Sequence, residues 1–168
     1  MSATIHGVSA TIHIGAAGYH RYASEFLGAY ERFVPQDSGF TPVPYFLVCR
    51  SIELAFKSYL VARGNTKKDL MNLSHVLIDG LNKARGEGIG SFIIITDEEI
   101  SLITSIDAYY HKKQFEYFER LDWIVDPTKL PRLKELGDFA RRLIMALNPA
   151  VINATSTGKI GKDGLPCS

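Results

Sequence analysis

The sequence contains little cysteine, little excess charge and no long apolar run. Its 168 residues include two cysteines, Cys49 and Cys167, and its formal net charge is +1. Two cysteines cannot form a disulfide framework and suit a reducing compartment, so we expect a cytoplasmic location. A nearly neutral chain has no strong overall field to attract nucleic acid or an anionic membrane, although a local basic patch is compatible with this charge.

Membrane, cofactor and metal signals are also missing. The most apolar stretch is interrupted by Arg50, Glu53 and Lys57, so no run reaches the ~18 apolar residues of a membrane span. The N-terminus has no basic region followed by an apolar run, which argues against a secretory signal. The glycine-rich run at 86–90 follows an expected helix and fits a helix terminator better than a phosphate loop. We therefore expect no membrane association, no cofactor and no metal.

Helical periodicity dominates the rest of the chain. Apolar residues recur at helical spacing within five segments, and Thr96 with Glu99 forms a capping-box pattern that opens the fourth. These patterns predict an all-α, up-and-down helical bundle of about five helices over residues 16–148, with a flexible leader at 1–15 and a flexible tail at 149–168. The expected helices are Ala16–Val34, Pro44–Gly64, Leu70–Arg85, one that begins after Thr96, and Leu130–Leu147. Residues 88–95 are expected to be an apolar loop that plugs the bundle.

The segment Pro44–Gly64 should be the central helix. Most of its apolar residues fall on one broad arc, but Leu47, Leu54 and Val61 recur every seven residues within the polar arc. A helix with two apolar seams should pack on two sides. We expect one partner to be its own bundle and the other a second subunit, so the sequence predicts a homodimer.

Charged residues on this helix are spaced for contact. Glu53 can pair with Arg50 at i, i+3 and with Lys57 at i, i+4. Two interpretations stay open: a solvated row of ion pairs, or a part-buried polar network that marks a site between helices. His75 lies near the start of the next expected helix, where a structural histidine is the commoner case.

The densest aromatic and basic stretch is 109–123. Nucleobases stack on aromatic rings while cations hold phosphates, so this stretch is a candidate surface for single-stranded RNA or a nucleotide. The alternative is that the rings cap the bundle while the charges reach water. The residues concerned are Tyr109, Tyr110, Lys112, Lys113 and Tyr117.

The run from Arg50 to Gly64, followed by a polar link and Leu73-Ser-His75-Val-Leu77, resembles the HEPN domain. In the family motif a central helix carries a Glu and a Lys four residues later, and the next helix opens with a His two residues before a Leu. Glu53, Lys57 and His75 match these positions. The resemblance implies a helical bundle, often dimeric, in which these residues stabilise the bundle or line a pocket.

HEPN members include ribonucleases, toxins of toxin–antitoxin pairs, partners of minimal nucleotidyltransferases, and proteins without known catalysis. The ribonucleases carry an Arg and a His with four to six residues between them, late in the bundle. The corresponding histidine here is His111, and the three positions for its Arg hold Thr104, Ser105 and Ile106. The chain therefore departs from the family at its catalytic pair.

We accordingly expect a non-catalytic HEPN-like protein that binds a nucleotide, RNA or a partner protein such as a nucleotidyltransferase, in a toxin–antitoxin or defence context. The first alternative is a divergent, metal-independent ribonuclease or toxin in which His111 acts as acid or base and Lys112 or Arg120 replaces the missing Arg. The second alternative is a purely structural interaction module. The expected ligand-binding residues are Arg50, Glu53, Lys57, His75, Tyr109, Tyr110, Lys112, Lys113 and Tyr117.

Overall fold

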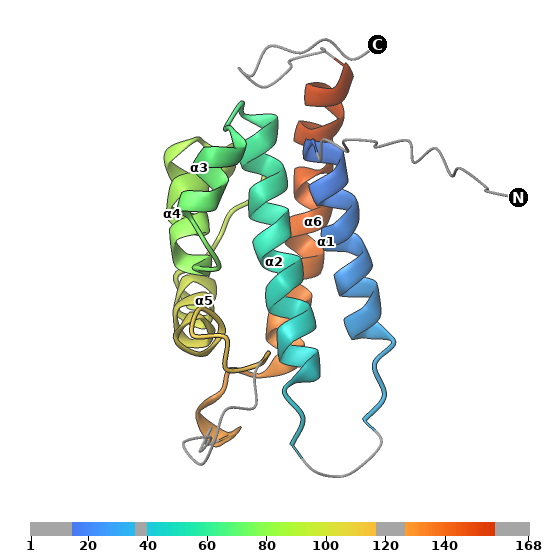
Figure 1. Ribbon diagram of the computed structural model, residues 1–168, viewed down its shortest axis with the longest axis vertical. Helices are drawn as coiled ribbons and strands as arrows, with labels where there is room; N and C mark the ends of the chain where they lie inside the picture. Colours follow the sequence, from blue (N-terminus) through green and yellow to red (C-terminus); the bar gives the residue numbers. More distant parts are fainter. Residues whose placement is uncertain (1–14, 36–39, 117–126, 157–168) are drawn as a thin grey trace, which may run out of the picture.

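The computed structural model describes residues 15–35, 40–116 and 127–156, and within these ranges the regular structure is entirely helical (Figure 1). This confirms the all-α helical bundle. The described residues form six α-helices and two short 3-10 turns, η1 (Ile89–Ser91) and η2 (Pro127–Lys129). The α-helices are α1 (Ala16–Glu31), α2 (Val43–Ala62), α3 (Lys67–Asn72), α4 (Leu77–Gly86), α5 (Asp97–Tyr110) and α6 (Leu133–Ser156). Residues 1–14 of the expected leader and 157–168 of the expected tail lie outside the described residues.

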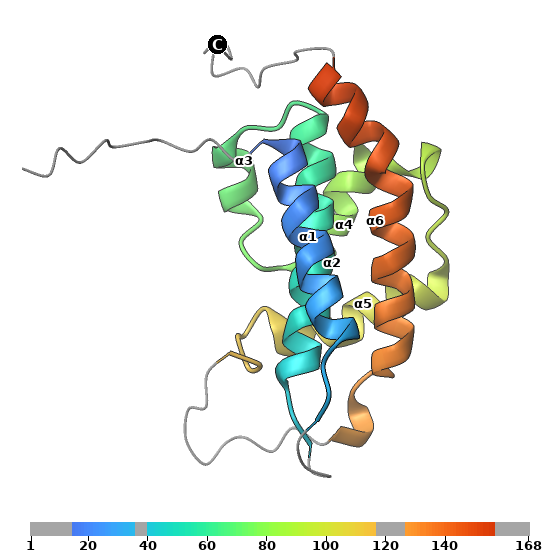
Figure 2. The ribbon, with the colours of Figure 1, turned by 90° about the vertical axis from the view of Figure 1, so that its right-hand side faces the viewer.

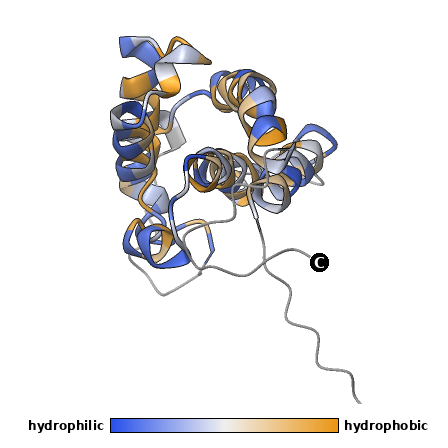
Figure 3. Cartoon of the chain, turned by 90° about the horizontal axis from the view of Figure 1, so that it is seen from above, coloured by the Kyte–Doolittle hydropathy of each residue, from blue (hydrophilic) through white to orange (hydrophobic). Residues whose placement is uncertain are grey.

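Helix α2 is the centre of the bundle. It packs against α1 and α6 on one side and against α4 and α5 on the other (Figures 1 and 2). Leu54, in the middle of the second apolar seam, is buried, and Leu47 and Val61 are half-buried. Seen from above, α2 stands in the middle, with other helices on several sides of it (Figure 3). Both seams are therefore covered within one chain. The seam argument for a homodimer is removed, and the homodimer itself stays a prediction.

The helices differ in direction. In Figure 1, α1 descends along the long axis, whereas α2 and α6 ascend, so α1 is antiparallel to both. Helix α5 is seen nearly end-on in that view and therefore lies across the long helices. This crossing places the C-terminal end of α5 beside the middle of α2, where Tyr110 of α5 reaches Glu53 of α2.

The prediction of one continuous helix over Leu70–Arg85 is wrong, because two helices, α3 and α4, occupy this part of the chain. Helix α3 starts earlier, because Thr66 and Asp69 form a capping box, and it ends at Asn72. Ser74 then adopts a left-handed conformation with φ 49°, and α4 begins only at Leu77. Residues 73–76, which lie between the two helices, include no Gly or Pro that would have predicted the break. Contacts from α2 to Ser74 and His75 hold the turn, so tertiary structure overrides the local helical preference.

The segment after α4 behaves largely as expected. Ile89 and Ile93 are buried, so the loop does fill part of the core, whereas Ile94 is exposed. The predicted capping box is present: Thr96 Oγ1 accepts the Glu99 N–H, and Glu99 Oε2 accepts the Thr96 N–H at 3.0 Å. The pattern identified the first turn of α5 correctly because a capping box satisfies local groups without tertiary help.

Helix α6 is longer than expected. It continues through Pro149 to Ser156, so 149–156 of the expected tail are helical. A proline inside a helix removes one N–H, and here the carbonyl left without that donor belongs to Met145. Met145 and Pro149 are both exposed, so water can hydrate this carbonyl, while Ala150 and Val151 are buried beyond it. No helix within the described ranges is long and apolar enough to cross a membrane.

Two buried helical glycines offer a matched prediction. A Cβ at Gly80 would meet the Phe56 ring at 3.5 Å, an ordinary contact, whereas a Cβ at Gly137 would lie 2.5 Å from Tyr30 Cε1. Gly80→Ala should raise the free energy of unfolding by about 0.5–1 kcal/mol through reduced backbone entropy in the unfolded chain. Gly137→Ala should lower it by about 1–2 kcal/mol, because overpacking outweighs that gain.

Urea unfolding of both variants measures this difference. The Tyr30 ring cannot move freely, because its hydroxyl donates to the Leu133 carbonyl at 3.1 Å. Equal effects of the two substitutions would contradict the close packing of α1 on α6.

Candidate functional site

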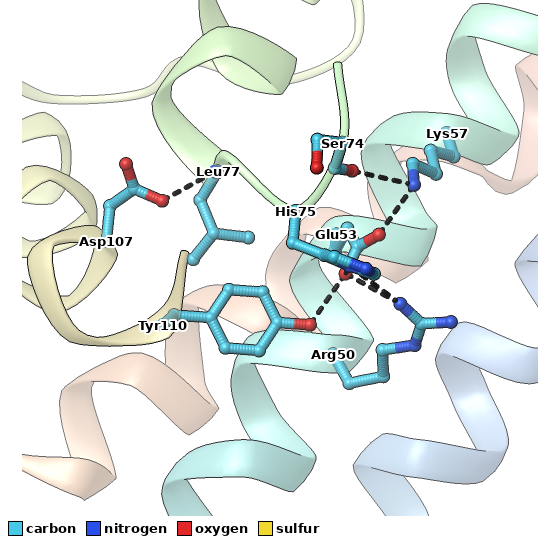
Figure 4. A network of polar contacts seen from close by, with 8 residues as sticks. All are labelled: Arg50, Glu53, Lys57, Ser74, His75, Leu77, Asp107 and Tyr110. Carbon is cyan, nitrogen blue, oxygen red and sulfur yellow. Dashed lines mark hydrogen bonds and ion pairs between the residues drawn. The ribbon is translucent and has the colours of Figure 1, made fainter. Parts of the chain in front are cut away.

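The charged residues of α2 gather around one buried carboxylate (Figure 4). The Glu53 side chain is 4% exposed. Its Oε1 accepts from Lys57 Nζ at 2.6 Å, and its Oε2 accepts from Arg50 Nη1 at 2.9 Å and from the Tyr110 hydroxyl at 2.6 Å. Helical spacing places Arg50 and Lys57 on the same side of α2 as Glu53, and the crossing of α5 supplies Tyr110. The interpretation as a part-buried network is therefore correct, and the solvated ion-pair row is wrong.

His75 joins the same carboxylate from the turn after α3. Its Nδ1 lies 3.2 Å from Glu53 Oε2 and 3.3 Å from Arg50 Nη1. A protonated Nδ1 donates to the carboxylate, and an unprotonated Nδ1 accepts from the guanidinium, so either neutral tautomer has a partner. The ring also meets Tyr110 edge-on, with centroids 6.4 Å apart. The position of His75 is thereby fixed by three side chains.

Lys57 links the network to the backbone of the turn. Besides Glu53, its ammonium group donates to the Ser74 carbonyl at 3.0 Å. Ser74 is one of two non-glycine residues with positive φ among those described. A left-handed serine is unfavourable by about 1–2 kcal/mol, so the turn depends on contacts such as this one.

The electrostatics of the network favour an ionised Glu53. Burial alone would raise the pKa of its carboxyl, but Lys57, Arg50 and the hydrogen bond from Tyr110 together outweigh burial and lower that pKa. Burial and the neighbouring Glu53 charge raise the pKa of the Tyr110 hydroxyl far above its ordinary value, so Tyr110 stays a donor. One negative charge thus faces the positive charges of Arg50 and Lys57, and these three groups together carry a net charge of about +1.

The outer edge of this network is open to solvent, and its interior is not. The side chains of Arg50 and His75 are 30% and 32% exposed, whereas Lys57 is 15% exposed. Figure 4 shows part of the Arg50 guanidinium turned away from Glu53. The cavity beside the network holds about 10 Å³, room for one water molecule. The solvent-accessible part of the network is therefore its Arg50–His75 edge, and the adjoining cavity is too small for anything larger than water.

Asp107 of α5 makes a contact near the site that the sequence did not indicate. Its side chain is buried, and Oδ1 accepts the backbone N–H of Leu77, the first residue of α4, at 2.7 Å. Asp107 therefore caps α4 from a different helix and fixes the chain just after His75. Burial raises the pKa of the Asp107 carboxyl more than the hydrogen bond to Leu77 and the charge on His111 lower it. Its 30-residue separation from Leu77 leaves no local sequence signal.

His111, the candidate catalytic residue, contacts Asp107. Its Nδ1–H donates to the Asp107 carbonyl at 2.5 Å, and the same nitrogen lies 3.9 Å from Asp107 Oδ2. This contact requires a proton on Nδ1, so in the neutral ring Nε2 is the acceptor. Of the cations proposed to replace the missing Arg, Lys112 is exposed and Arg120 lies outside the described residues.

The predicted aromatic residues are divided between different roles. Tyr110 is buried in the network, whereas Tyr109 stacks on Phe115, which in turn stacks on Tyr45, at centroid distances of 6.3 and 5.6 Å. Phe115 is buried and Tyr109 half-buried, so these rings mainly cap the bundle, as the structural alternative predicted. Lys113 has a positive φ of 58° in the same turn. Tyr117 lies outside the described residues.

A second, larger hollow lies between α5 and α6. It has a volume of about 270 Å³ and is lined by apolar and mostly acidic side chains. The lining residues are Glu98, Glu99, Leu102, Glu135, Asp138, Phe139 and Arg142. Arg142 pairs with Glu99, and Asp138 pairs with Lys134 and Arg141, so much of the negative charge is neutralised within the chain.

No group of three or more metal-ligating side chains occurs in the part of the chain that the structure describes. What the network offers is the partly exposed guanidinium donors of Arg50, held by a buried carboxylate, with His75 beside them. Such donors bind an anion such as a phosphate. Compared with protein-family models, curated proteins and solved structures, the chain matches none. The HEPN resemblance therefore stays a proposal.

Proposed function

We propose that this chain is a non-catalytic HEPN-like protein that binds the phosphate of a nucleotide or of RNA at the Arg50–His75 edge. The observation that carries the proposal is that one buried carboxylate, Glu53, orients Arg50 and Lys57 together with His75. These are the residue types that bind phosphates, and their orientation is fixed before any ligand arrives.

Charge supports an anionic ligand. Glu53 is fully compensated by Lys57 and Arg50, so an approaching phosphate meets a net positive cluster. Arg50 uses Nη1 for Glu53 and keeps further N–H donors for a ligand, since a guanidinium has five. Positions 104–106, where the ribonuclease motif places its Arg before His111, hold no basic residue, which supports binding without cleavage.

The proposal places the protein with the HEPN members that bind nucleic acid, nucleotides or a partner such as a nucleotidyltransferase. A toxin–antitoxin or defence context is part of that proposal. The ligand surface does not depend on a second subunit, because all four groups around Glu53 come from one chain.

Arg50→Lys tests the proposal without removing charge. The lysine can still pair with Glu53, but it lacks the planar fork that holds phosphate through two N–H groups. We expect affinity for a fluorescein-labelled single-stranded RNA, or for AMP, to fall about tenfold, which corresponds to loss of one charge-assisted hydrogen bond. Fluorescence anisotropy at several salt concentrations measures the loss, and binding should weaken with salt.

Arg21→Lys is the matched control, because Arg21 pairs with Glu25 on an exposed face of α1. Equal affinities of the two variants, or no binding of either probe by the native protein, would contradict the proposal. RNA cleavage that disappears in His111→Ala would instead support the ribonuclease alternative.

A further inference from the structure

We infer that residues 67–74, which comprise α3 and the turn that ends at Ser74, form a strap that opens and closes over Lys57. In the closed state the Ser74 carbonyl accepts a hydrogen bond from the Lys57 ammonium group. A ligand phosphate competes with this carbonyl, so opening of the strap adds Lys57 to the phosphate-binding edge. This inference rests on the proposed function and concerns the regulation of that site.

The strap is weakly attached along its length. Helix α3 has six residues, and Leu70 is its single buried residue. Met71 is 69% exposed, and both lysines at the start of α3 are exposed. So few apolar contacts favour local opening well below the free energy of global unfolding.

Both ends of the strap are firmly held. At one end, Asn65 Nδ2 donates to the Leu60 carbonyl at 2.9 Å and to Glu87 Oε2 at 2.7 Å. At the other end, the His75 ring contacts Glu53 and Tyr110, and Asp107 fixes the Leu77 N–H. The motion is therefore confined to the segment between these anchors, and His75 stays at the edge.

The closed state is strained and imperfectly packed. Ser74 has φ 49°, which an L-residue adopts reluctantly and glycine adopts freely. Beneath the strap lies the cavity of about 10 Å³, whose apolar wall includes Phe56, Leu60 and Gly80. A void of this kind loses dispersion contacts on one side.

Opening leaves the buried charge satisfied. When Ser74 moves away, Glu53 keeps Arg50, Lys57, Tyr110 and His75, and the network itself loses only the Lys57–Ser74 hydrogen bond. Lys57 then has a donor for a phosphate oxygen, next to Arg50 on the same face of α2. The number of cations available to the ligand rises from one to two, with His75 beside them.

Hydrogen exchange tests the motion itself, with or without a ligand. The reporters are the amides of Leu70 and Ser74, whose hydrogen bonds to the Thr66 and Met71 carbonyls break when the strap opens. Ser74→Gly removes the strain of the closed turn, so exchange of these amides should slow about five- to thirtyfold. Ser74→Ala is the control, because alanine keeps the Cβ and its strain. Strap amides that exchange only by global unfolding, or equal rates in the two variants, would overturn the inference.

Binding of the labelled single-stranded RNA tests the gating. Ser74→Gly should weaken binding relative to Ser74→Ala, because it favours the closed strap. Leu70→Ala removes the anchor of α3 without touching the edge and should strengthen binding. Equal affinities among variants that differ in exchange would refute the gating alone. Absence of binding by every variant would refute the proposed function and the gating with it, while the exchange rates would still report the motion.

Discussion

Replacing Glu53 with glutamine is expected to lower the free energy of unfolding by about 3 kcal/mol. The substitution keeps the size of the side chain but removes the charge that compensates Arg50 and Lys57. Breaking a buried pair by removing one partner destabilises by about 3–5 kcal/mol. The lower figure applies because both cations are partly exposed and can recover some hydration. Urea denaturation of the native protein and of Glu53→Gln measures the difference.

The same experiment has a defined pH dependence. Because the pKa of Glu53 is lowered in the folded state, its stabilisation is complete above its ordinary value of 4.5 and is lost as pH falls through the folded pKa. The stability difference between the native protein and Glu53→Gln should therefore be constant near neutrality and shrink in acid.

Glu25→Gln is the control for this prediction, since Glu25 forms an exposed i, i+4 pair with Arg21. We expect it to change stability by less than about 0.5 kcal/mol. A Glu53→Gln protein as stable as Glu25→Gln at neutral pH would show that the network contributes nothing to the fold.

Replacing Asp107 with alanine is expected to destabilise the protein by about 2 kcal/mol. The change leaves the N–H of Leu77, a fully buried residue, without its acceptor, and an unsatisfied buried donor is unfavourable by about 1–3 kcal/mol. Relief of the burial that raises the pKa of Asp107 offsets part of this loss. Because Asp107 caps α4, exchange of the Gly80 amide, which donates to the Val76 carbonyl in the first turn, should accelerate as well.

Asp79→Ala provides the comparison for the cap. Asp79 is an exposed carboxylate in the first turn of the same helix, so its loss removes only a favourable interaction with the helix dipole. We expect an effect of about 0.5 kcal/mol. If Asp79→Ala destabilised the protein as much as Asp107→Ala, the dipole and not the hydrogen bond from Leu77 would explain the effect.

Local patterns predicted those parts of the fold that satisfy their own polar groups or repeat regularly. The apolar arc of Pro44–Gly64 located α2 within one or two residues at each end. The Thr96–Glu99 box located the start of α5, and the i, i+3 and i, i+4 spacing of Arg50, Glu53 and Lys57 anticipated their contacts. The capping box and the ion-pair spacing each lie within about one or two helical turns, and the apolar arc repeats at steps of that size along the helix.

Sequence patterns did not predict the features that depend on contacts between residues far apart in the chain. The break at Ser74 depends on Lys57, which is 17 residues away, and the start of α4 depends on Asp107. The continuation of α6 past Pro149 depends on which side of the helix faces water. The second seam of α2 indicated a second partner correctly, but that partner is another part of the same chain.

The sequence by itself determined that the chain is helical, that its most apolar helix is central, and that Glu53 has cations within reach. Only the tertiary structure decided that Glu53 is buried, that Tyr110 and His75 complete its coordination, and that a strained turn covers Lys57. The physical reason is the distance along the chain over which each interaction acts. Helix periodicity and ion-pair spacing act between neighbours in sequence, whereas burial, and with it the strength of every charge interaction at the site, depends on segments brought together by folding.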